Sequence, residues 1–155
     1  MSQLASGDNA PPFELPTDGG GSASLSAYRG RKLVIFFYPG DDGSTCTAEA
    51  QDFTAAKAEF EAAGTAVIGI SPDSVKSHDK FKLKRGLDVT LASDEGKGVL
   101  EAYGVWQEKQ MYGRTYMGVV RTTMLVDAEG RIARIWPAVK VKGHVAEVLA
   151  AAKAL

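Results

Sequence analysis

A continuous apolar run that leads through a short polar loop into a helix-like stretch constrains this chain more than any other feature. The run Lys32–Tyr38 is apolar and aromatic after its first residue, as expected of a strand buried on both faces. Beyond the loop, apolar residues recur at helical spacing and predict a helix over Thr45–Ala63, with Gly64 as its terminator. Thr65–Ile70 then predicts a second buried strand. Two strands joined by a helix of this length should pair in parallel.

The segments on either side extend this order to an α/β fold, a sandwich with a mixed central β-sheet flanked by helices. The stretch Gly104–Gly118 follows neither period and is expected to be an irregular connection, and residues 1–9 are expected to be a flexible lead-in. The further predicted elements are short strands at Phe13–Leu15 and Ala23–Leu25, a helix over Ser74–Arg85, a strand over Val89–Ala92, a helix over Gly96–Tyr103, strands over Val119–Val126 and Arg131–Trp136 joined by a turn at Asp127–Gly130, and a helix over Gly143–Leu155.

Length and charge restrict the classes of function. A chain of 155 residues, 45% hydrophobic and 24% charged, is expected to form one domain over residues 1–155. Its net charge of −1 offers no basic face for nucleic acid. The first twelve residues do not resemble a secretory signal, and no apolar stretch is long enough to cross a bilayer, so we expect a cytoplasmic protein with no membrane partner. Small molecules or other proteins are the expected partners.

Cys46, the only cysteine, lies at the junction of the polar loop and the predicted helix. A lone cysteine is most often a small hydrophobic side chain packed in a core. Its neighbours nevertheless describe an exposed polar turn, and Ser44 or Thr45 is suited to be the N-cap of the helix. The first turn of a helix favours a thiolate over a thiol through its free N–H groups and its dipole. Cys46 is therefore a candidate nucleophile.

Other side chains able to take part in chemistry have simpler interpretations. His78 and His144 lie on predicted helices without metal-ligand spacing, so we expect surface residues and neither a metal nor another cofactor. The aromatic residues Trp106, Tyr112 and Tyr116 of the irregular stretch could line a site, but packing is the better expectation.

Four segments of the chain form a recognisable pattern through their order and spacing. They are FFYPGDDGSTCTAEAQDF at Phe36–Phe53, GISPDSVKSHDKF at Gly69–Phe81, LASDEGKGVLEAYGVW at Leu91–Trp106 and YGRTYMGVVRTTMLVD at Tyr112–Asp127. Together they resemble the peroxiredoxins of the bacterioferritin comigratory protein (PrxQ) subfamily, and the similarity runs from about Ala10 to the C-terminus. The resemblance implies a thioredoxin-like fold with the reactive cysteine at the N-terminus of the first main helix.

The resemblance implies roles for the residues of the loop and its surroundings. Cys46 would be the peroxidatic cysteine, whose thiolate attacks the O–O bond of a hydroperoxide and becomes a sulfenic acid. Arg121 matches the active-site arginine of the family, and Glu49 matches the carboxylate that orients this arginine. Pro39 corresponds to the proline that shields the site from water, and Tyr38 precedes it as in the family pattern.

Each of the charged matches also has a simpler alternative. Arg121 could be a surface charge on a strand, and Glu49 could be a capping-box acid that stabilises the start of the helix. Arg114, a second cation nearby in the sequence, is expected to be solvated rather than catalytic.

The chain departs from the family pattern at two positions. Gly43 stands where the family places a threonine or serine whose hydroxyl donates to the thiolate, and Ser44 or Thr45 could replace it only in a rearranged loop. The loss of one such donor would cost on the order of 3 kcal/mol in the barrier, roughly a hundredfold in rate. Gln51 stands where many members carry a resolving cysteine, so an internal disulfide cannot form.

The sequence therefore predicts a thiol-dependent peroxidase of the one-cysteine type that reduces hydrogen peroxide and alkyl hydroperoxides. An external thiol (thioredoxin, glutaredoxin or glutathione) would reduce its sulfenic acid, and we expect a monomer, although two copies could join through Cys46. The alternative is a non-enzymatic or weakly active redox module of thioredoxin fold that senses oxidation or engages a partner. A thiol–disulfide oxidoreductase is disfavoured because Cys46 has no partner in a C-x-x-C pair.

Overall fold

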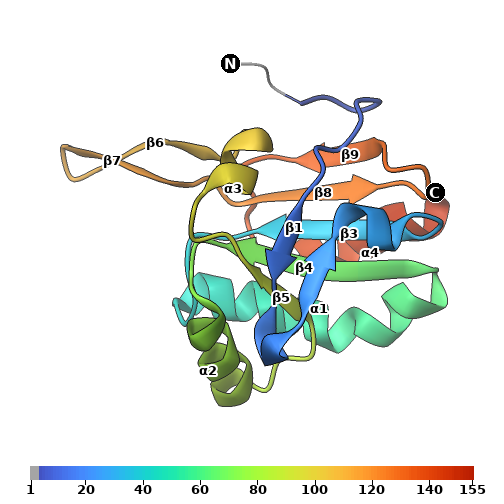
Figure 1. Ribbon diagram of the computed structural model, residues 1–155, viewed down its shortest axis with the longest axis horizontal. Helices are drawn as coiled ribbons and strands as arrows, with labels where there is room; N and C mark the ends of the chain where they lie inside the picture. The colour runs from blue at the N-terminus through green and yellow to red at the C-terminus, as the bar shows by residue number, and fades with distance from the viewer. Residues whose placement is uncertain (1–3) are drawn as a thin grey trace.

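The computed structural model describes residues 4–155 and is built around a five-stranded mixed sheet (Figure 1). Its strands are β1 Glu14–Pro16, β2 Ser22–Ser24, β3 Lys32–Phe37, β4 Thr65–Ser71, β5 Thr90–Ser93, β6 Trp106–Met111, β7 Arg114–Val119, β8 Thr122–Val126 and β9 Ile132–Trp136. The central sheet has the order β5-β4-β3-β8-β9, in which β3, β4 and β5 are parallel and β8 is antiparallel to β3 and β9. The predicted mixed sheet and the parallel pairing of β3 with β4 are confirmed.

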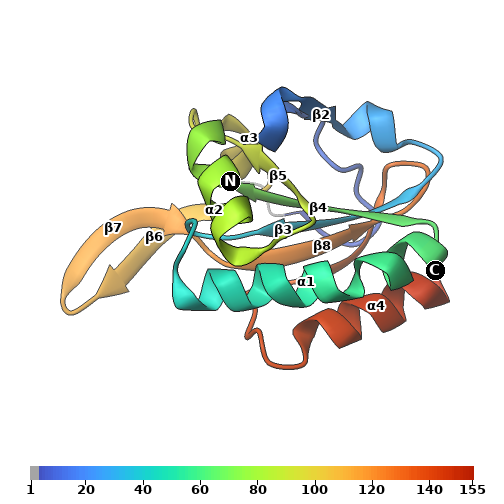
Figure 2. The same ribbon diagram turned by 90° about the horizontal axis from the view of Figure 1, so that it is seen from below.

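Helices cover the sheet in two layers, as Figure 2 shows from the side. The helices are α1 Ser44–Ala62, α2 Val75–Arg85, α3 Gly98–Ala102 and α4 His144–Ala154, with 3₁₀ turns at Asp18–Gly20 and Leu25–Tyr28. α1 and α4 lie side by side under one face, and α3 lies with the β1–β2 hairpin over the other (Figure 2). No helix within residues 4–155 is long and apolar enough to span a membrane.

Strand β3 explains why its sequence is apolar without interruption. Leu33, Ile35 and Phe37 point into the core beneath β1, β2 and α3, whereas Val34 and Phe36 point into the core shared with α1 and α4. A strand covered on both faces needs apolar residues at every position. The ring of Phe36 stacks on Phe53 of α1 with centroids 4.6 Å apart, so β3 and α1 pack directly against each other.

The stretch Gly104–Gly118 is a hairpin, so the expectation of an irregular connection is wrong. Strands β6 and β7 pair antiparallel, with Met111 opposite Arg114. The two-residue turn between them has φ 52° at Tyr112 and 74° at Gly113. Positive φ at both residues defines a type I′ turn, whose usual signal is Asn-Gly or Asp-Gly. Tyrosine at the first position hides that signal in the sequence.

The single strand expected over Val119–Val126 is divided in two. Val119 ends β7 and Thr122 begins β8. Between them, the N–H of Val120 donates to Val105 and the carbonyl of Arg121 accepts from Val139. The chain therefore passes from the hairpin into the central sheet at this point, and the interruption lies next to Arg121.

Part of the expected flexible lead-in forms backbone contacts, and residues 1–3 lie outside the described residues. The N–H of Gly7 donates to Ile132, and the N–H of Ile132 donates to Asp8. Asn9 forms an antiparallel bridge with Arg131. Residues 7–9 thus run along β9 and form backbone hydrogen bonds with the free edge of that strand.

Candidate active site

Cys46 lies in the first turn of α1, but it is buried. The N-cap is Gly43, which makes no side-chain cap, and the helix begins at Ser44, so the predicted N-caps Ser44 and Thr45 are wrong. Ser44 and Thr45 are exposed, whereas the side chain of Cys46 is only 6% exposed. The expectation of an exposed position is wrong for Cys46 because the helix turns it inward, on the same face as Ala50 and Phe53.

Arg121 and Glu49 meet at the cysteine although they come from different parts of the chain. The Nη2 atom of Arg121 donates to Cys46 Sγ at 3.2 Å, and its Nη1 atom donates to Glu49 Oε1 at 2.7 Å. Glu49 is fully buried and lies three residues after Cys46 on α1. Arg121 is mostly buried, so the alternative of a surface charge does not hold, and Glu49 pairs with Arg121 rather than capping the helix.

Burial shapes the charges in this cluster. Removal from water raises the pKa of Glu49 to about 7, and the guanidinium of Arg121 opposes this shift only in part. Burial lowers the pKa of Arg121, but the hydrogen bond to Cys46 and the charge of Glu49 outweigh burial and raise it. Glu49 Oε2 has no hydrogen-bond partner among the described residues. Arg121 therefore stays a cation beside the sulfur while Glu49 can change charge near neutral pH.

The remaining predicted positioning residues are less directly connected to the sulfur. Pro39 is half-buried and directly follows Tyr38 beyond the carboxyl end of β3. Tyr38 is buried, and its hydroxyl donates to Asp41 Oδ1 at 2.7 Å. No hydrogen bond within residues 4–155 joins the hydroxyls of Ser44 or Thr45 to Cys46. The structure thus brings together Cys46, Arg121 and Glu49, and directs the hydroxyl of Tyr38 elsewhere.

Gly43, at the position of the missing hydroxyl, has room for a side chain. Its backbone is extended, with φ −70° and ψ 150°, a conformation that any residue adopts. A Cβ atom placed there would meet nothing within 4 Å. A threonine could therefore be accommodated without moving the loop.

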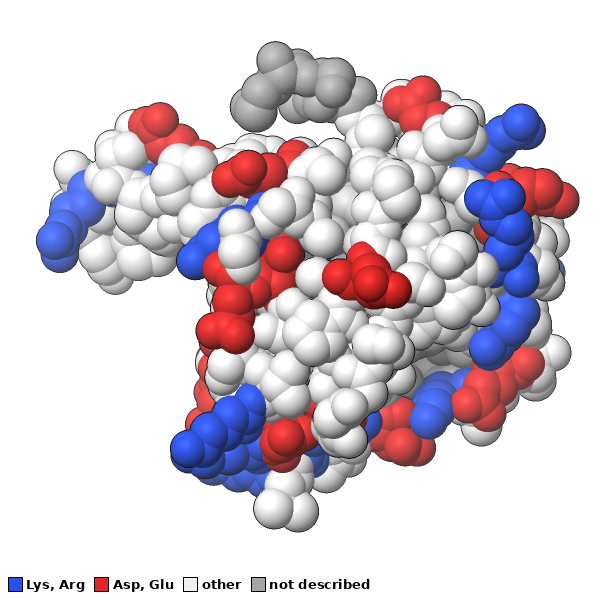
Figure 3. All heavy atoms as spheres, viewed as in Figure 1, with Lys and Arg blue, Asp and Glu red and all other residues white. Residues whose placement is uncertain are grey.

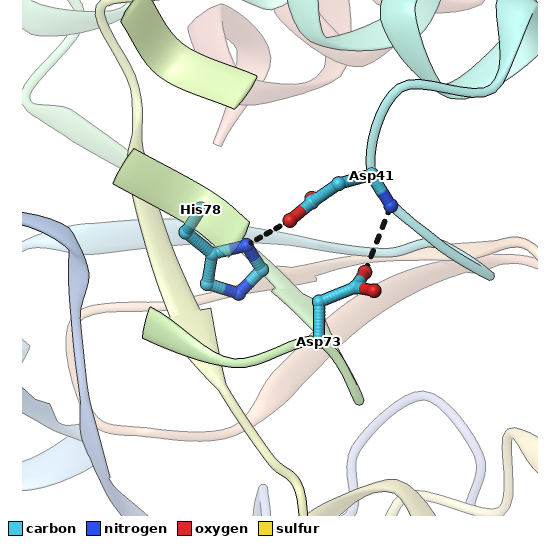
Figure 4. A group of neighbouring side chains, drawn as sticks. All are labelled: Asp41, Asp73 and His78. Carbon is cyan, nitrogen blue, oxygen red and sulfur yellow. Dashed lines mark hydrogen bonds and ion pairs between the residues drawn. The ribbon is translucent and has the colours of Figure 1, made fainter. Parts of the chain in front are cut away.

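A partly buried network that joins the loop to α2 was not predicted from the sequence (Figure 4). Asp41 Oδ2 lies 2.8 Å from His78 Nδ1, and the N–H of Asp41 donates to Asp73 Oδ2 at 2.8 Å. His78 Nε2 lies 3.0 Å from the carbonyl oxygen of Ala92. His78 is fully buried, so the expectation of a surface residue is wrong. Its spacing from Phe81 on α2, three residues, was the available signal of an inward face.

Hydrogen bonds within the described residues account for the arrangement of this network. Asp41, Asp73 and His78 hold their ligand atoms within 4.8 Å of one another. Because a carbonyl oxygen can only accept, Nε2 of His78 carries a proton, and Nδ1 faces a carboxylate. Burial lowers the pKa of His78, but the hydrogen bond and the charge of Asp41 outweigh burial and raise it. A protonated ring satisfies both acceptors and ties the loop to α2.

His144 is also buried, contrary to the expectation of a surface residue. Its Nε2 lies 2.8 Å from Thr123 Oγ1, and its ring lies edge-on to the rings of Phe53 and Trp136. Burial lowers its pKa. The position shares a helical face with Val148, four residues later, which is part of the core between α4 and the sheet.

The three aromatic residues expected to pack do not behave alike. Trp106 is half-buried and packs against the core. Tyr112 and Tyr116 are 96% and 40% exposed, so the expectation is wrong for these two residues. Both belong to the hairpin, which extends beyond the core (Figure 1). Arg114, on the same hairpin, is exposed as expected.

Comparison with known proteins places this geometry in a family. Residues 6–135 match the model of the AhpC/TSA family. Peroxiredoxin Bcp of Bacillus subtilis is 44% identical over 143 residues, 92% of this chain and 91% of that protein. Peroxiredoxin Bcp of Xanthomonas campestris is 45% identical over 147 residues, 94% of this chain and 92% of that protein. The chain also resembles a structure of the Xanthomonas campestris bacterioferritin comigratory protein that concerns the alkyl peroxide reduction activity of that protein. The two structures superpose with a TM-score of 0.87 at 44% sequence identity, over 92% of this chain and 90% of that chain.

Proposed function

The chain belongs to the AhpC/TSA family as a peroxiredoxin of the Bcp type, a thiol-dependent peroxidase, and from this premise we propose that Cys46 is its peroxidatic thiol. The observation that carries the proposal is the 3.2 Å hydrogen bond from Arg121 Nη2 to Cys46 Sγ. A permanent cation at this distance favours the thiolate, which is the nucleophilic form. The substrate is a hydroperoxide, and the reducing equivalents come from thiols.

The first half of the reaction oxidises the sulfur. The Cys46 thiolate attacks the terminal oxygen of a hydroperoxide, a sulfur–oxygen bond forms and the O–O bond breaks. The product is a sulfenic acid on Cys46, and the departing alkoxide or hydroxide takes a proton from solvent to become an alcohol or water. Negative charge moves from sulfur to the departing oxygen, so donors that contact both atoms lower the barrier.

The surrounding residues have distinct parts in this proposal. Arg121 contacts the sulfur and stabilises both the thiolate and the charge that develops on the peroxide. Glu49 holds Arg121 in place through the 2.7 Å ion pair. N–H groups of the first turn of α1, which have no acceptor within the helix, would donate to a peroxide bound at Cys46. Pro39 borders the loop and limits access of water to the sulfur.

The second half of the reaction needs a thiol from another molecule. A thiolate attacks the sulfur of the sulfenic acid, water leaves, and a mixed disulfide forms; a second thiol then releases Cys46 as a thiolate and leaves a disulfide. Because the chain contains one cysteine, both thiols are external. We assign this role to thioredoxin, glutaredoxin or glutathione, acting in the cytoplasm on a monomer that forms a single domain.

Peroxide consumption tests the assignment of Cys46. The native protein and Cys46→Ser are each mixed with hydrogen peroxide or an alkyl hydroperoxide and dithiothreitol, and the loss of peroxide is followed. We expect one disulfide per peroxide with the native protein and no turnover above the uncatalysed rate with Cys46→Ser. Equal turnover by the two proteins would contradict the proposal. Thermal unfolding of both proteins checks that the substitution leaves the fold intact.

A further inference from the structure

The β6–β7 hairpin stands away from the body of the molecule, as Figures 1 and 3 show. Among its polar and charged residues, the hairpin carries four large apolar or aromatic side chains that are exposed. Met111 is 55%, Tyr112 96% and Met117 50% exposed, and Tyr116 lies on the same hairpin. These four account for most of the large hydrophobic side chains that are exposed within residues 4–155. Exposed apolar groups gathered in one place mark interaction sites more often than scattered ones do.

The turn at the tip of the hairpin contains a residue in a backbone conformation that its type disfavours. Tyr112 adopts φ 52° at the first position of the type I′ turn, where asparagine, aspartate or glycine is favoured. A bulky residue with positive φ is strained. The same side chain is almost completely in water, so no packing within the described chain offsets the strain. Neither turn geometry nor core formation explains tyrosine at this position.

The hairpin is also an isolated two-stranded sheet. Within residues 4–155, β6 and β7 pair only with each other, so each strand keeps one edge without a partner. Two-stranded sheets of this kind are marginal by themselves, and open edges invite pairing with another chain. A partner that lies on the hairpin would cover apolar side chains and open edges together.

The position of the hairpin connects it to Cys46. Val119 ends β7, and Arg121, two residues later, donates to the sulfur. Figures 1 and 2 both show the hairpin and the first turn of α1 at the same end of the molecule. A protein held by the hairpin would therefore lie beside the mouth of the candidate active site.

We propose that the β6–β7 hairpin is the docking arm for the protein dithiol, of the thioredoxin type, that reduces the sulfenic acid of Cys46. This inference rests on the proposed function, because it names the partner of the same site. The single cysteine of the chain requires a thiol from another molecule. Tyrosine and methionine supply an adaptable, apolar contact suited to a partner that must bind and leave in every cycle.

The size of the patch favours a short-lived partner over a second copy of this chain. Side chains alternate between the two faces of a strand, so Met111 and Tyr116 share one face, with Tyr112 at its tip, whereas Met117 points to the other face. The three on one side offer on the order of 400 Å², or about 800 Å² over both partners. Stable interfaces bury roughly 1,200–2,000 Å², whereas short-lived redox complexes lie below that range. The patch thus matches a redox encounter better than a permanent dimer.

The variant Tyr112→Asn tests the proposal without endangering the fold. Asparagine before Gly113 is the preferred type I′ sequence, so the turn should be as stable as in the native protein or more stable. Three rates are measured for native protein and variant: oxidation of Cys46 by hydrogen peroxide, reduction of its sulfenic acid by dithiothreitol, and reduction by a reduced thioredoxin. We expect the first two rates to be unchanged and the third to fall about tenfold.

Leu83→Asn is the matched control. Leu83 is 88% exposed on α2, so the substitution removes a similar apolar side chain outside the hairpin. Its three rates should equal those of the native protein. A thioredoxin rate that falls equally in both variants would overturn the proposal, because the effect would then follow surface hydrophobicity in general.

Other outcomes separate this inference from the proposed function. The docking arm is overturned if Tyr112→Asn leaves the thioredoxin rate unchanged, or if thioredoxin does not reduce native Cys46. In either case, oxidation of Cys46 by peroxide would still support the peroxidase role. A native dimer that becomes monomeric in Tyr112→Asn, measured by sedimentation, would assign the hairpin to a second copy and overturn the proposal. A native Cys46 that peroxide does not oxidise would refute the proposed function itself.

Discussion

Replacing Arg121 by methionine removes the charge next to the sulfur while keeping a side chain of similar length. The substitution deletes the 3.2 Å hydrogen bond to Cys46 and the 2.7 Å pair with Glu49. If Arg121 stabilises the thiolate and the charge that develops on the peroxide, oxidation of Cys46 must slow. A structural role alone would change the stability of the protein but not this rate.

The expected size of the effect follows from the distance between the charges. Two unit charges 3.2 Å apart interact by about 1.3 kcal/mol in water and by about 5 kcal/mol at an effective dielectric constant of about 20. These limits correspond to slowing by roughly tenfold and by several thousandfold. The site is mostly buried but reached by substrate, so we expect a loss of about a hundredfold, within the range for removal of one donor from a charge-stabilising site.

The assay measures a single oxidation and corrects for the stranded carboxylate. Reduced protein is mixed rapidly with hydrogen peroxide, quenched with a sulfenic-acid trap and analysed by mass, which reports on Cys46 alone because it is the only cysteine. In Arg121→Met, Glu49 loses its partner while fully buried. The double variant Arg121→Met with Glu49→Gln removes that carboxylate, and the cycle with Glu49→Gln isolates the effect of the arginine.

The reasoning fails if Arg121→Met oxidises Cys46 as fast as the native protein. It also fails if the rate recovers fully in the double variant, because the loss would then come from the stranded carboxylate and not from the missing cation. The expected pattern is a slow rate in both variants that carry Arg121→Met and a smaller loss in Glu49→Gln, whose amide oxygen can still accept the hydrogen bond from Arg121.

Three further predictions address the loop and its supports. Gly43→Thr should raise the oxidation rate and stabilise α1 by only a few tenths of a kcal/mol, because a hydroxyl fits there without a clash but glycine is itself a favourable N-cap. An equal or lower rate in rapid mixing would count against a positioned hydroxyl. Burial raises the pKa of Glu49 to about 7 from its usual 4.5. The contribution of Glu49 to the free energy of unfolding is therefore complete below pH 4.5 and is lost as pH rises through 7. Glu49→Gln should flatten the pH dependence of the free energy of unfolding, measured with denaturant, over that interval. Asp41→Asn should destabilise the protein by about 3 kcal/mol, measured by urea unfolding. In the native protein, the stability that comes from the pair is lost as pH rises through the raised pKa of His78, and the variant should lack this pH dependence. Unchanged urea midpoints would show that the pair does not hold the loop.

The central part of the fold could be predicted because local pattern and tertiary packing agree there. The apolar run of β3 follows from burial of both its faces, and the helical spacing of α1 follows from burial of one face. The β6–β7 hairpin could not be predicted in the same way. Its turn carries Tyr112 where asparagine is usual, and its strands bury little, so neither turn residue nor alternation indicated it.

The candidate site was accessible only in part from local sequence. Cys46 at a helix start follows from local pattern, whereas its contact with Arg121, 75 residues away, was expected from the family resemblance alone. The burial of Cys46 and His78 was missed because polar neighbours in the sequence suggested exposure. Helical spacing carries that information: Cys46 shares a face with Phe53, and His78 shares one with Phe81.

The central claim is that Arg121 and the first turn of α1 hold Cys46 as a thiolate that a peroxide can reach. The most direct measurement is the rate at which peroxide oxidises Cys46 in the native protein, compared with a free cysteine thiol at the same pH. We expect oxidation at least about a thousandfold faster in the protein, which corresponds to about 4 kcal/mol of barrier. A rate equal to that of the free thiol would contradict the account, because the buried cation and helix start would then give the sulfur no advantage.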